Sequence, residues 1–431
     1  MRFFRDSIGV VGLWHLGCVI CASWSKFGKN TIGFDYNLSR IKHLKKGIPP
    51  LYEPGLAGAI RQGIKRKSLF FSNNINSLSH CDFIFLSYDT PVRDDDSCNI
   101  KILMKSIKDL SEISKDGTII IVSSQLPVGL SRLLRKELKQ NNPSLELVYS
   151  PENLRLGEAI NCYMKPSRVI LGGVDRKAIF RVKSLFSQIT PDILSMNLES
   201  AEMVKHGINS FLATSIVFSN HIADICEMVG ARIDDVIKGL KSDPRIGERS
   251  YLSPGIGFSG GTLGRDLRVL ARINSKKMGF AKIFKIVYRL NQERRNVIVN
   301  KIIKILGSIK GAQIGILGIT YKPGTSTLRR SLALEIAGII ARNNVKIKIF
   351  DPKADYSEVS LPGVYEICKD LEAVSENSDI LVLLTEWSDF KKANWKVVAK
   401  KMKRKLFFDT KNFLDEKLMS SYGFKYYSIG R

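Results

Sequence analysis

Two glycines, Gly12 and Gly17, frame a short loop near the start of the chain in the sequence GLWHLG. The loop lies between two apolar stretches, the order of strand, turn and helix in which the dinucleotide-binding fingerprint G-x-G-x-x-G occurs. The outer glycines are present, but Trp14 replaces the middle glycine, which normally lets the backbone approach a pyrophosphate. We therefore expect Trp14 to point away from the ligand, or the ligand to sit differently.

An acidic residue, Asp35, ends the next predicted strand, 18 residues after Gly17. A carboxylate there can accept hydrogen bonds from ribose hydroxyls and repel a 2′-phosphate, which favours NAD over NADP. The alternative is an ordinary strand–turn–helix with a capping aspartate. The order strand, loop, helix, strand and Asp favours dinucleotide binding, with NAD contacts predicted at Gly12, Leu13, His15, Leu16, Gly17 and Asp35.

Two polar residues, Lys205 and Asn209, stand four apart in a long apolar stretch, and so on one face of a helix. A charged residue on a mostly apolar helix is either solvated or part of a site. Taken alone, Lys205 is expected to be solvated.

A glycine-rich stretch at 243–266 also contains arginines and the aromatic residues Tyr251 and Phe258. Such a stretch suits a loop that wraps a phosphorylated ligand through its backbone N–H groups. A flexible linker is the alternative, but the aromatic residues and the lack of low complexity argue against it.

Ordered blocks of sequence now make the chain resemble the UDP-glucose/GDP-mannose dehydrogenase family over nearly its whole length. The blocks are YEPGL (52–56), DTP (89–91), LPVG (126–129), SPENLRLGEAI (150–160), KHGINSFLAT (205–214), DPRIG (243–247), GFSGGTLGRD (257–266), YKPGTSTLRRS (321–331), TEW (385–387) and DTKN (409–412). The resemblance implies an enzyme that uses two NAD to oxidise the C6 alcohol of a nucleotide sugar to the acid. In the family UDP-glucose becomes UDP-glucuronate for surface polysaccharide, and the aldehyde is not released.

The resemblance also implies roles for single residues. Lys205 and Asn209 match the residues that stabilise developing oxyanions and bind the sugar, and Asp266 matches an aspartate that assists the water or the first deprotonation. Glu152 matches the first glutamate of the family's block in the 150s, and Arg245 a substrate arginine that often crosses the dimer interface. The other predicted substrate contacts are Leu154, Tyr251, Gly257, Phe258, Lys322 and Arg329, and the other predicted NAD contacts are Thr90, Gln125 and Arg265.

Some positions depart from the family pattern. The catalytic cysteine of the family falls on Thr262, and the other departures are Arg265 for a lysine, Leu156 for a second glutamate, Gln125 for a threonine and Lys411 for an arginine. A thiolate forms readily and adds to an aldehyde, whereas a threonine hydroxyl has a far higher pKa. With Thr262 as the candidate catalytic group, a two-electron oxidation is the alternative to the full reaction. A non-catalytic relative that binds nucleotide sugar is a further alternative, against which the retained Lys205, Asn209 and Asp266 argue.

Strands and helices alternate around these residues. Strands are predicted at 7–12, 31–35, 81–87, 117–124 and 145–150, and again at 312–319, 346–351, 380–385 and 406–410. Alternation implies parallel, doubly wound sheets. The expected class is α/β, with two Rossmann-like doubly wound domains joined by a central helical domain with a long spine helix. The predicted borders are 1–195 for the NAD-binding domain, 196–305 for the central dimerisation domain and 306–431 for the UDP-sugar-binding domain.

Composition narrows the class of protein. A chain of 431 residues needs more than one core. Its net charge of +26 indicates a basic surface, which suits a phosphorylated small molecule. The sequence has no basic stripe with base-reading residues, so nucleic-acid binding is not expected. No apolar window reaches the roughly 18 residues of a membrane span. The seven scattered cysteines, with Cys18 and Cys21 on an apolar helix, indicate a reduced cytoplasmic protein. We expect a homodimer through the central helix, and no metal.

Overall fold

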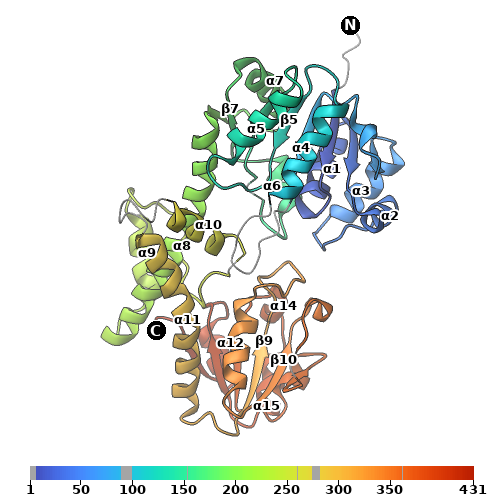
Figure 1. Cartoon of the computed structure of the whole chain (residues 1–431). Coiled ribbons are helices and arrows are strands. Elements are labelled where there is room, and N and C mark those ends of the chain that lie inside the picture. The colour runs from blue at the N-terminus through green and yellow to red at the C-terminus, as the bar shows by residue number, and fades with distance from the viewer. Residues whose placement is uncertain (1–5, 89–99, 153, 260, 274–281, 362) are drawn as a thin grey trace. The chain divides into compact units, whose positions relative to one another are not determined.

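The computed structural model describes residues 6–88, 100–152, 154–259, 261–273, 282–361 and 363–431. Its contacts divide the chain into two compact units, Met1–Gly207 and Ile208–Arg431. Each unit contains a sheet flanked by helices (Figure 1). The predicted α/β class, with two Rossmann-like sheets and a helical region between them in sequence, is confirmed. The proposed borders of three domains stay a prediction.

The first unit is built on an eight-stranded sheet in the order β3-β2-β1-β4-β5-β6-β7-β8. Its strands are β1 (Ser7–Val11), β2 (Asn30–Phe34), β3 (Leu69–Ser72), β4 (Phe83–Leu86), β5 (Ile119–Val122), β6 (Glu146–Tyr149), β7 (Val169–Gly173) and β8 (Ile193–Met196). The order of the first six strands is that of a dinucleotide-binding fold, which places ligands at the carboxyl ends of the strands beside the switch between β1 and β4.

One pair of neighbours in this sheet, β6 and β7, is antiparallel. β7 was not among the predicted strands, and the predicted strands β1, β2, β4, β5 and β6 pair in parallel, as expected. The connection between the two strands carries only the six-residue helix α6 (Ala159–Met164). A parallel return needs a crossover connection, usually a longer helix. The chain turns back here instead, and the segment before α6 follows the carboxyl end of β6.

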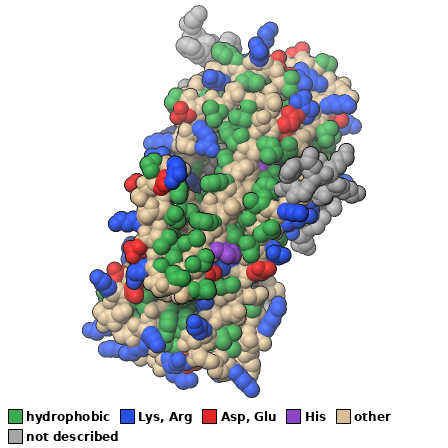
Figure 2. Space-filling view, turned by 90° about the vertical axis from the view of Figure 1, so that its left-hand side faces the viewer, with side chains coloured by type: hydrophobic (Ala, Val, Ile, Leu, Met, Phe, Trp, Pro, Cys, Tyr) green, Lys and Arg blue, Asp and Glu red, His purple; other side chains and the backbone are tan. Residues whose placement is uncertain are grey.

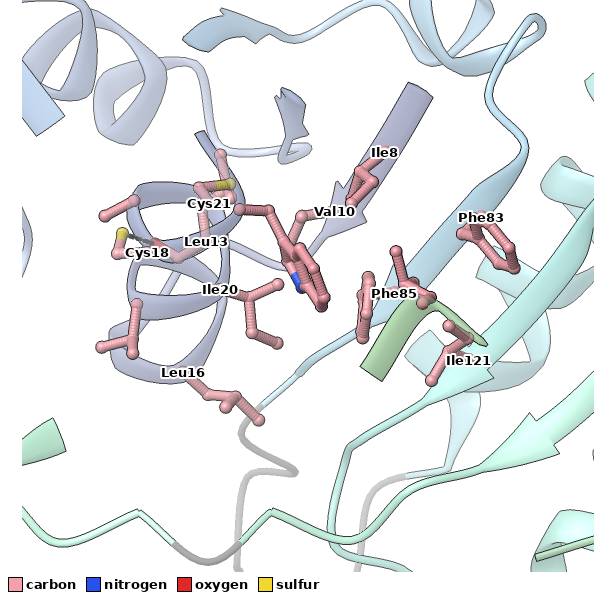
Figure 3. Close-up of a cluster of buried hydrophobic side chains, with 14 of the residues drawn as sticks. Ile8, Val10, Leu13, Leu16, Cys18, Ile20, Cys21, Phe83, Phe85 and Ile121 are labelled. Atoms are coloured by element: carbon pink, nitrogen blue, oxygen red, sulfur yellow. Dashed lines mark hydrogen bonds between the residues drawn. The ribbon is translucent and has the colours of Figure 1, made fainter. Parts of the chain in front are cut away.

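The helices of the first unit cover its sheet and bury their apolar faces. Besides α6 they are α1 (His15–Lys26), α2 (Leu38–Lys45), α3 (Leu56–Lys65), α4 (Lys101–Ile113), α5 (Leu130–Asn141) and α7 (Arg176–Phe186), with the short 3-10 turn η1 (Ile75–Leu78). Figure 3 shows side chains of α1 beside those of β1, β4 and β5 in one buried cluster. Cys18 and Cys21 are buried thiols in this cluster, and burial, aided by Cys18, raises the pKa of Cys21 well above its usual value. The pair is core, as expected from the sequence.

The second unit holds a six-stranded, all-parallel sheet in the order β11-β10-β9-β12-β13-β14. Its strands are β9 (Gln313–Leu317), β10 (Lys346–Phe350), β11 (Tyr365–Ile367), β12 (Ile380–Leu383), β13 (Leu406–Asp409) and β14 (Lys425–Ser428). Its helices are α9 (Ile233–Ser242), α10 (Leu263–Arg272), α11 (Lys282–Leu306), α12 (Leu332–Ala341), α13 (Leu371–Ser375), α14 (Ser388–Lys391), α15 (Trp395–Lys401) and α16 (Glu416–Ser421), with the 3-10 turn η3 (Tyr356–Glu358).

The long helix predicted after residue 196 is α8 (Leu198–Val229), 32 residues that run from the first unit into the second. Within the described residues, no helix is both long and apolar enough to cross a membrane. The cytoplasmic location stays a prediction.

Candidate active site

The loop between β1 and α1 requires glycine at both of its ends. Gly12 has a φ of +92°, a left-handed conformation that other residues rarely adopt. A Cβ on Gly17 would lie 1.9 Å from the carbonyl oxygen of Gly12, so no larger residue fits there. The two glycines bring the first turn of α1 against the end of β1. Because that turn has no side-chain cap, its N–H groups suit a phosphate.

Trp14, in place of the middle glycine, lies on the α2 side of this loop. The guanidinium of Arg40 stands over its indole ring, 5.2 Å from the ring centroid, and pairs with Asp35 at 2.6 Å. Trp14 and Arg40 both line a cavity of 320 Å³ next to the start of α2. Sequence reasoning missed Arg40, whose signal is a basic residue five positions after the strand-ending aspartate.

Asp35 is buried directly after β2. One carboxylate oxygen accepts the N–H of Leu13 at 2.8 Å and the other accepts the N–H of Asn37 at 2.9 Å. The side chains of Leu13 and Leu16 belong to the core, so Leu13 acts here through its backbone. A fixed carboxylate at the end of the second strand and an uncapped helix N-terminus fit the ribose and the pyrophosphate of NAD.

Two further predicted NAD contacts come later in the first unit. Gln125 is half-buried and stands three residues after β5. The carboxyl ends of parallel strands meet at one edge of the sheet, so Gln125 lies at the same edge as Gly12 and Asp35. Thr90 lies outside the described residues.

His15, the first residue of α1, reaches a buried carboxylate on another segment. Its Nε2 is 2.8 Å from Oε2 of Glu53. The same oxygen accepts the N–H of Gly157, and Oε1 accepts the N–H of Ala159, each at 2.9 Å. Burial opposes ionisation of Glu53, but the hydrogen bonds outweigh it and lower the pKa of this carboxyl. Sequence reasoning quoted the YEPGL block but gave Glu53 no role.

Replacing Glu53 by Gln should destabilise the protein most at neutral pH and least in acid. Because the pKa is lowered in the folded state, the carboxylate contributes stability that is present above the unfolded pKa of about 4.3. That stability is lost as the pH falls through the folded pKa. The melting temperatures of both proteins between about pH 7 and pH 3 measure the effect, with Glu112→Gln on exposed α4 surface as the control. A melting difference that widens toward acid would contradict the assignment.

Lys205 is buried on α8, only 6 % exposed, so the expectation of a solvated lysine is wrong. Its Nζ donates to the carbonyl of Glu152 at 2.5 Å and lies 3.5 Å from the carboxylate of the same residue. The start of α8 is fixed by Glu202, which accepts the N–H groups of Gly129 and Ser131 at the start of α5. The helix face that carries Lys205 is therefore packed into the first unit, and the ammonium is held beside Glu152.

The carboxylate of Glu152 is itself held by the backbone. Its Oε2 accepts the N–H of Leu154 at 2.6 Å. The first unit thus gathers Glu152, Leu154 and Lys205 into one group.

The second unit gathers another group of predicted catalytic residues. Asn209, one turn after Lys205 on α8, donates to the carboxylate of Asp266 at 2.5 Å. Asp266 is fully buried in the first turn of α10. Thr262 immediately precedes α10, four residues before Asp266, and its side chain makes no capping hydrogen bond. Arg265 is half-buried, and its Nε has no hydrogen-bond partner among the described residues.

The glycine-rich stretch before α10 is held by α11. The side chain of Asn291 accepts the N–H of Phe258 at 2.9 Å and donates to the carbonyl of Phe258 at 2.8 Å. Arg294 donates to the carbonyl of Gly255 at 2.9 Å. Gly257 between them has a φ of +102°, and a Cβ there would lie 2.5 Å from Asn291. This part is not a flexible linker, and sequence reasoning missed both residues of α11.

The remaining predicted substrate contacts are spread over the second unit. Arg245 and Tyr251 are exposed, and Arg245 pairs with Asp243 at 2.6 Å. Lys322 is half-buried and Arg329 exposed, both between β9 and α12. In the part of the chain that the structure describes, no group of three or more His, Cys, Asp and Glu residues could hold a metal ion.

The second sheet repeats one feature of the first, because Asp351 follows β10 as Asp35 follows β2. The Asp351 carboxylate accepts hydrogen bonds from the backbone and hydroxyl of Thr320 at 2.9 Å and from the indole of Trp387 at 3.2 Å. Its donors thus include a buried aromatic side chain, and this aspartate serves the local fold. An aspartate after the second strand therefore does not by itself mark a dinucleotide site.

Comparisons with known proteins show which family the chain belongs to. Three family models match the chain: the UDP-glucose/GDP-mannose dehydrogenase family NAD binding domain over residues 6–190, its central domain over 199–293 and its UDP binding domain over 315–416. UDP-glucose 6-dehydrogenase TuaD of Bacillus subtilis is 32% identical over 430 residues, 98% of this chain and 93% of that protein. UDP-glucose 6-dehydrogenase of Rickettsia typhi is 32% identical over 98% of this chain and 99% of its own length.

A solved structure shares the fold over the whole chain. A UDP-glucose dehydrogenase from Pyrobaculum islandicum superposes with a TM-score of 0.89 at 24% identity, covering 100% of this chain and 99% of that one. With the three family models and relatives at 32% identity, the chain belongs to the UDP-glucose/GDP-mannose dehydrogenase family of NAD-dependent oxidoreductases.

Proposed function

We propose that this protein oxidises the C6 alcohol of a UDP-hexose, with UDP-glucose as the substrate and surface polysaccharide as the destination of the product. The UDP binding domain of the family supports a UDP-sugar, and the relatives named UDP-glucose 6-dehydrogenase support glucose. The observation that carries the proposal is the buried ammonium of Lys205 beside Glu152. Removing a charged group from water costs free energy, so a lysine without a role in the site would be expected at the surface.

The first oxidation removes a hydride from C6 and a proton from its hydroxyl. Bound NAD supplies the hydride acceptor. In our proposal Lys205 donates to the developing alkoxide, and a preorganised donor in a water-poor site contributes about 3 kcal/mol to such a transition state. Asp266 takes the proton, directly or through a water molecule, with its carboxylate oriented by Asn209.

Thr262 leads us to propose further that the reaction stops after this first oxidation. The hydroxyl of Thr262 takes the place of a thiol at the start of α10 and carries an adjacent methyl group. Among its contacts in the described structure, no capping hydrogen bond orients the side chain. Addition to the aldehyde is therefore disfavoured, and we expect one NADH for each sugar.

The substrate is tested by following NADH absorbance with UDP-glucose, UDP-N-acetylmannosamine and GDP-mannose. We expect turnover with UDP-glucose. Turnover with the acetylated sugar alone would overturn the choice of glucose. No NADH with any of the three would favour a non-catalytic relative that only binds nucleotide sugar.

We further propose that the protein is a homodimer through α8. Phe211, Phe218 and Ile225 are seven residues apart, about two helical turns, so they form one stripe along α8. Their exposed fractions are 68%, 47% and 52%. Figure 2 views the molecule from the side on which α8 lies, and hydrophobic side chains are exposed on that side. A stripe of large apolar residues on a long helix is typical of an interface between copies.

The double variant Phe211→Asp, Phe218→Asp should convert the dimer into a monomer, because each carboxylate would be buried without a partner. Light scattering after size exclusion measures the mass, which we expect to fall to the 48.4 kDa of one chain. The control is Phe180→Asp, since Phe180 on α7 is equally apolar and 72% exposed. A wild-type protein that already runs as a monomer would contradict the proposal.

A further inference from the structure

One buried carboxylate, that of Glu53, connects the dinucleotide loop to the segment that carries Glu152. The side chain of Glu53 is 0% exposed. On one side it meets the ring of His15, the first residue of α1. On the other side it accepts the N–H groups of Gly157 and Ala159, which lie more than a hundred residues from it in the chain.

The start of α6 depends on this distant carboxylate. Glu158 stands at the N-cap of α6, but its side chain makes no capping hydrogen bond. The N–H groups before and after it are instead taken by Glu53. Gly157 has a φ of +87°, so the backbone turns sharply just where the carboxylate holds it. Glu53 therefore acts as the cap of this helix.

The same segment carries Glu152 and Leu154 a few residues earlier. At that end it is held by Lys205, which donates to the carbonyl of Glu152 at 2.5 Å. The segment from 150 to 159 is thus fixed at one end by Lys205 and at the other by Glu53. Any shift of Glu53 moves the second of these supports.

Burial explains why the connection is strong. An ionised carboxylate without water needs all of its hydrogen bonds, and loss of one donor leaves charge unpaired in a low dielectric. The lowered pKa of Glu53 agrees with a carboxylate that stays ionised in this position. The donors to Glu53 are His15, in the dinucleotide loop, and Gly157 and Ala159, in the segment that carries Glu152. Order in the loop therefore favours order in the segment, and the reverse.

We propose that His15 and Glu53 are positioning residues that couple NAD binding on the loop to nucleotide-sugar binding by the segment 150–159. The inference rests on the proposed function for the identity of the sugar. A dinucleotide on the first turn of α1 fixes the His15 ring, the ring fixes Glu53, and Glu53 holds the start of α6. By linkage, each ligand raises the affinity for the other by the same factor.

The experiment measures the Kd of UDP-glucose by calorimetry with and without saturating NADH, which permits no turnover. We expect NADH to tighten binding about tenfold in the wild type, within the usual range of coupling between sites. His15→Leu removes the donor and should reduce this factor to about one. His15→Gln restores an N–H donor and should restore the factor. His80→Leu, at an exposed histidine of the same unit, is the control.

Several results would overturn the coupling. They are an equal factor in His15→Leu and the wild type, a factor of one in the wild type, or a failure of His15→Gln to restore it. If His15→Leu does not fold, Glu53→Asp shortens the carboxylate and must lower the factor. A wild type that binds NADH but no UDP-glucose would instead refute the proposed substrate, because the coupling can only be measured where the sugar binds.

Discussion

Replacing Thr262 by Cys should raise the yield from one NADH to two for each UDP-glucose consumed. Residue 262 immediately precedes α10, and a thiol at a helix N-terminus ionises more readily than a free one. The thiolate adds to the C6 aldehyde, and the resulting thiohemiacetal would give its hydride to a second NAD and its hydroxyl proton to a base, which leaves a thioester. Water then releases the acid and regenerates the thiolate. The measurement is NADH absorbance at completion with limiting UDP-glucose.

The control for this gain is Thr214→Cys, which places a thiol on α8 rather than before α10. It should leave the yield at one NADH. A yield that stays at one in Thr262→Cys, in a protein that still binds both ligands, would show that another departure, such as Leu156, limits the second oxidation.

Replacing Lys205 by Met should lower kcat for UDP-glucose oxidation by about a hundred- to a thousandfold. The methionine keeps most of the buried volume but removes the positive charge that would stabilise the alkoxide. Because Lys205 is only 6% exposed and its Nζ donates to the carbonyl of Glu152, solvent cannot replace this charge. Steady-state kinetics with both substrates saturating measure the effect.

The matched control is Lys177→Met, at an exposed lysine of α7 in the same unit. It should leave kcat unchanged. Melting temperatures of both variants separate a catalytic defect from unfolding. A Lys205→Met protein that folds and keeps kcat within about tenfold of the wild type would remove Lys205 from the chemistry.

The sequence predicted the interior strands of the two sheets, except β7 (Val169–Gly173). The edge strands β3, β8, β11 and β14 were all missed. Interior strands are buried on both faces and read as continuous apolar runs, such as IIIV in β5. Edge strands include exposed and polar positions, as in ILSM of β8. Their patterns resemble loops when they are read alone.

Some features of the site can be predicted from the spacing of residues in the sequence, whereas others depend on packing between distant segments. Glycine loops and the i, i+4 pair of Lys205 and Asn209 follow from local geometry. The burial of Lys205, by contrast, depends on Glu202 and on segments far away in the chain. The hydrogen bonds of Glu53 and Asn291 reach residues more than thirty positions away, so no local pattern announces them.

The stoichiometry of the wild-type enzyme tests the central claim most directly. Limiting UDP-glucose is incubated with excess enzyme and NAD, NADH is counted by absorbance, and the sugar nucleotide is identified by mass spectrometry. We expect one NADH for each sugar and a UDP-hexose aldehyde or its hydrate. Two NADH for each sugar, with UDP-glucuronate as the product, would contradict it.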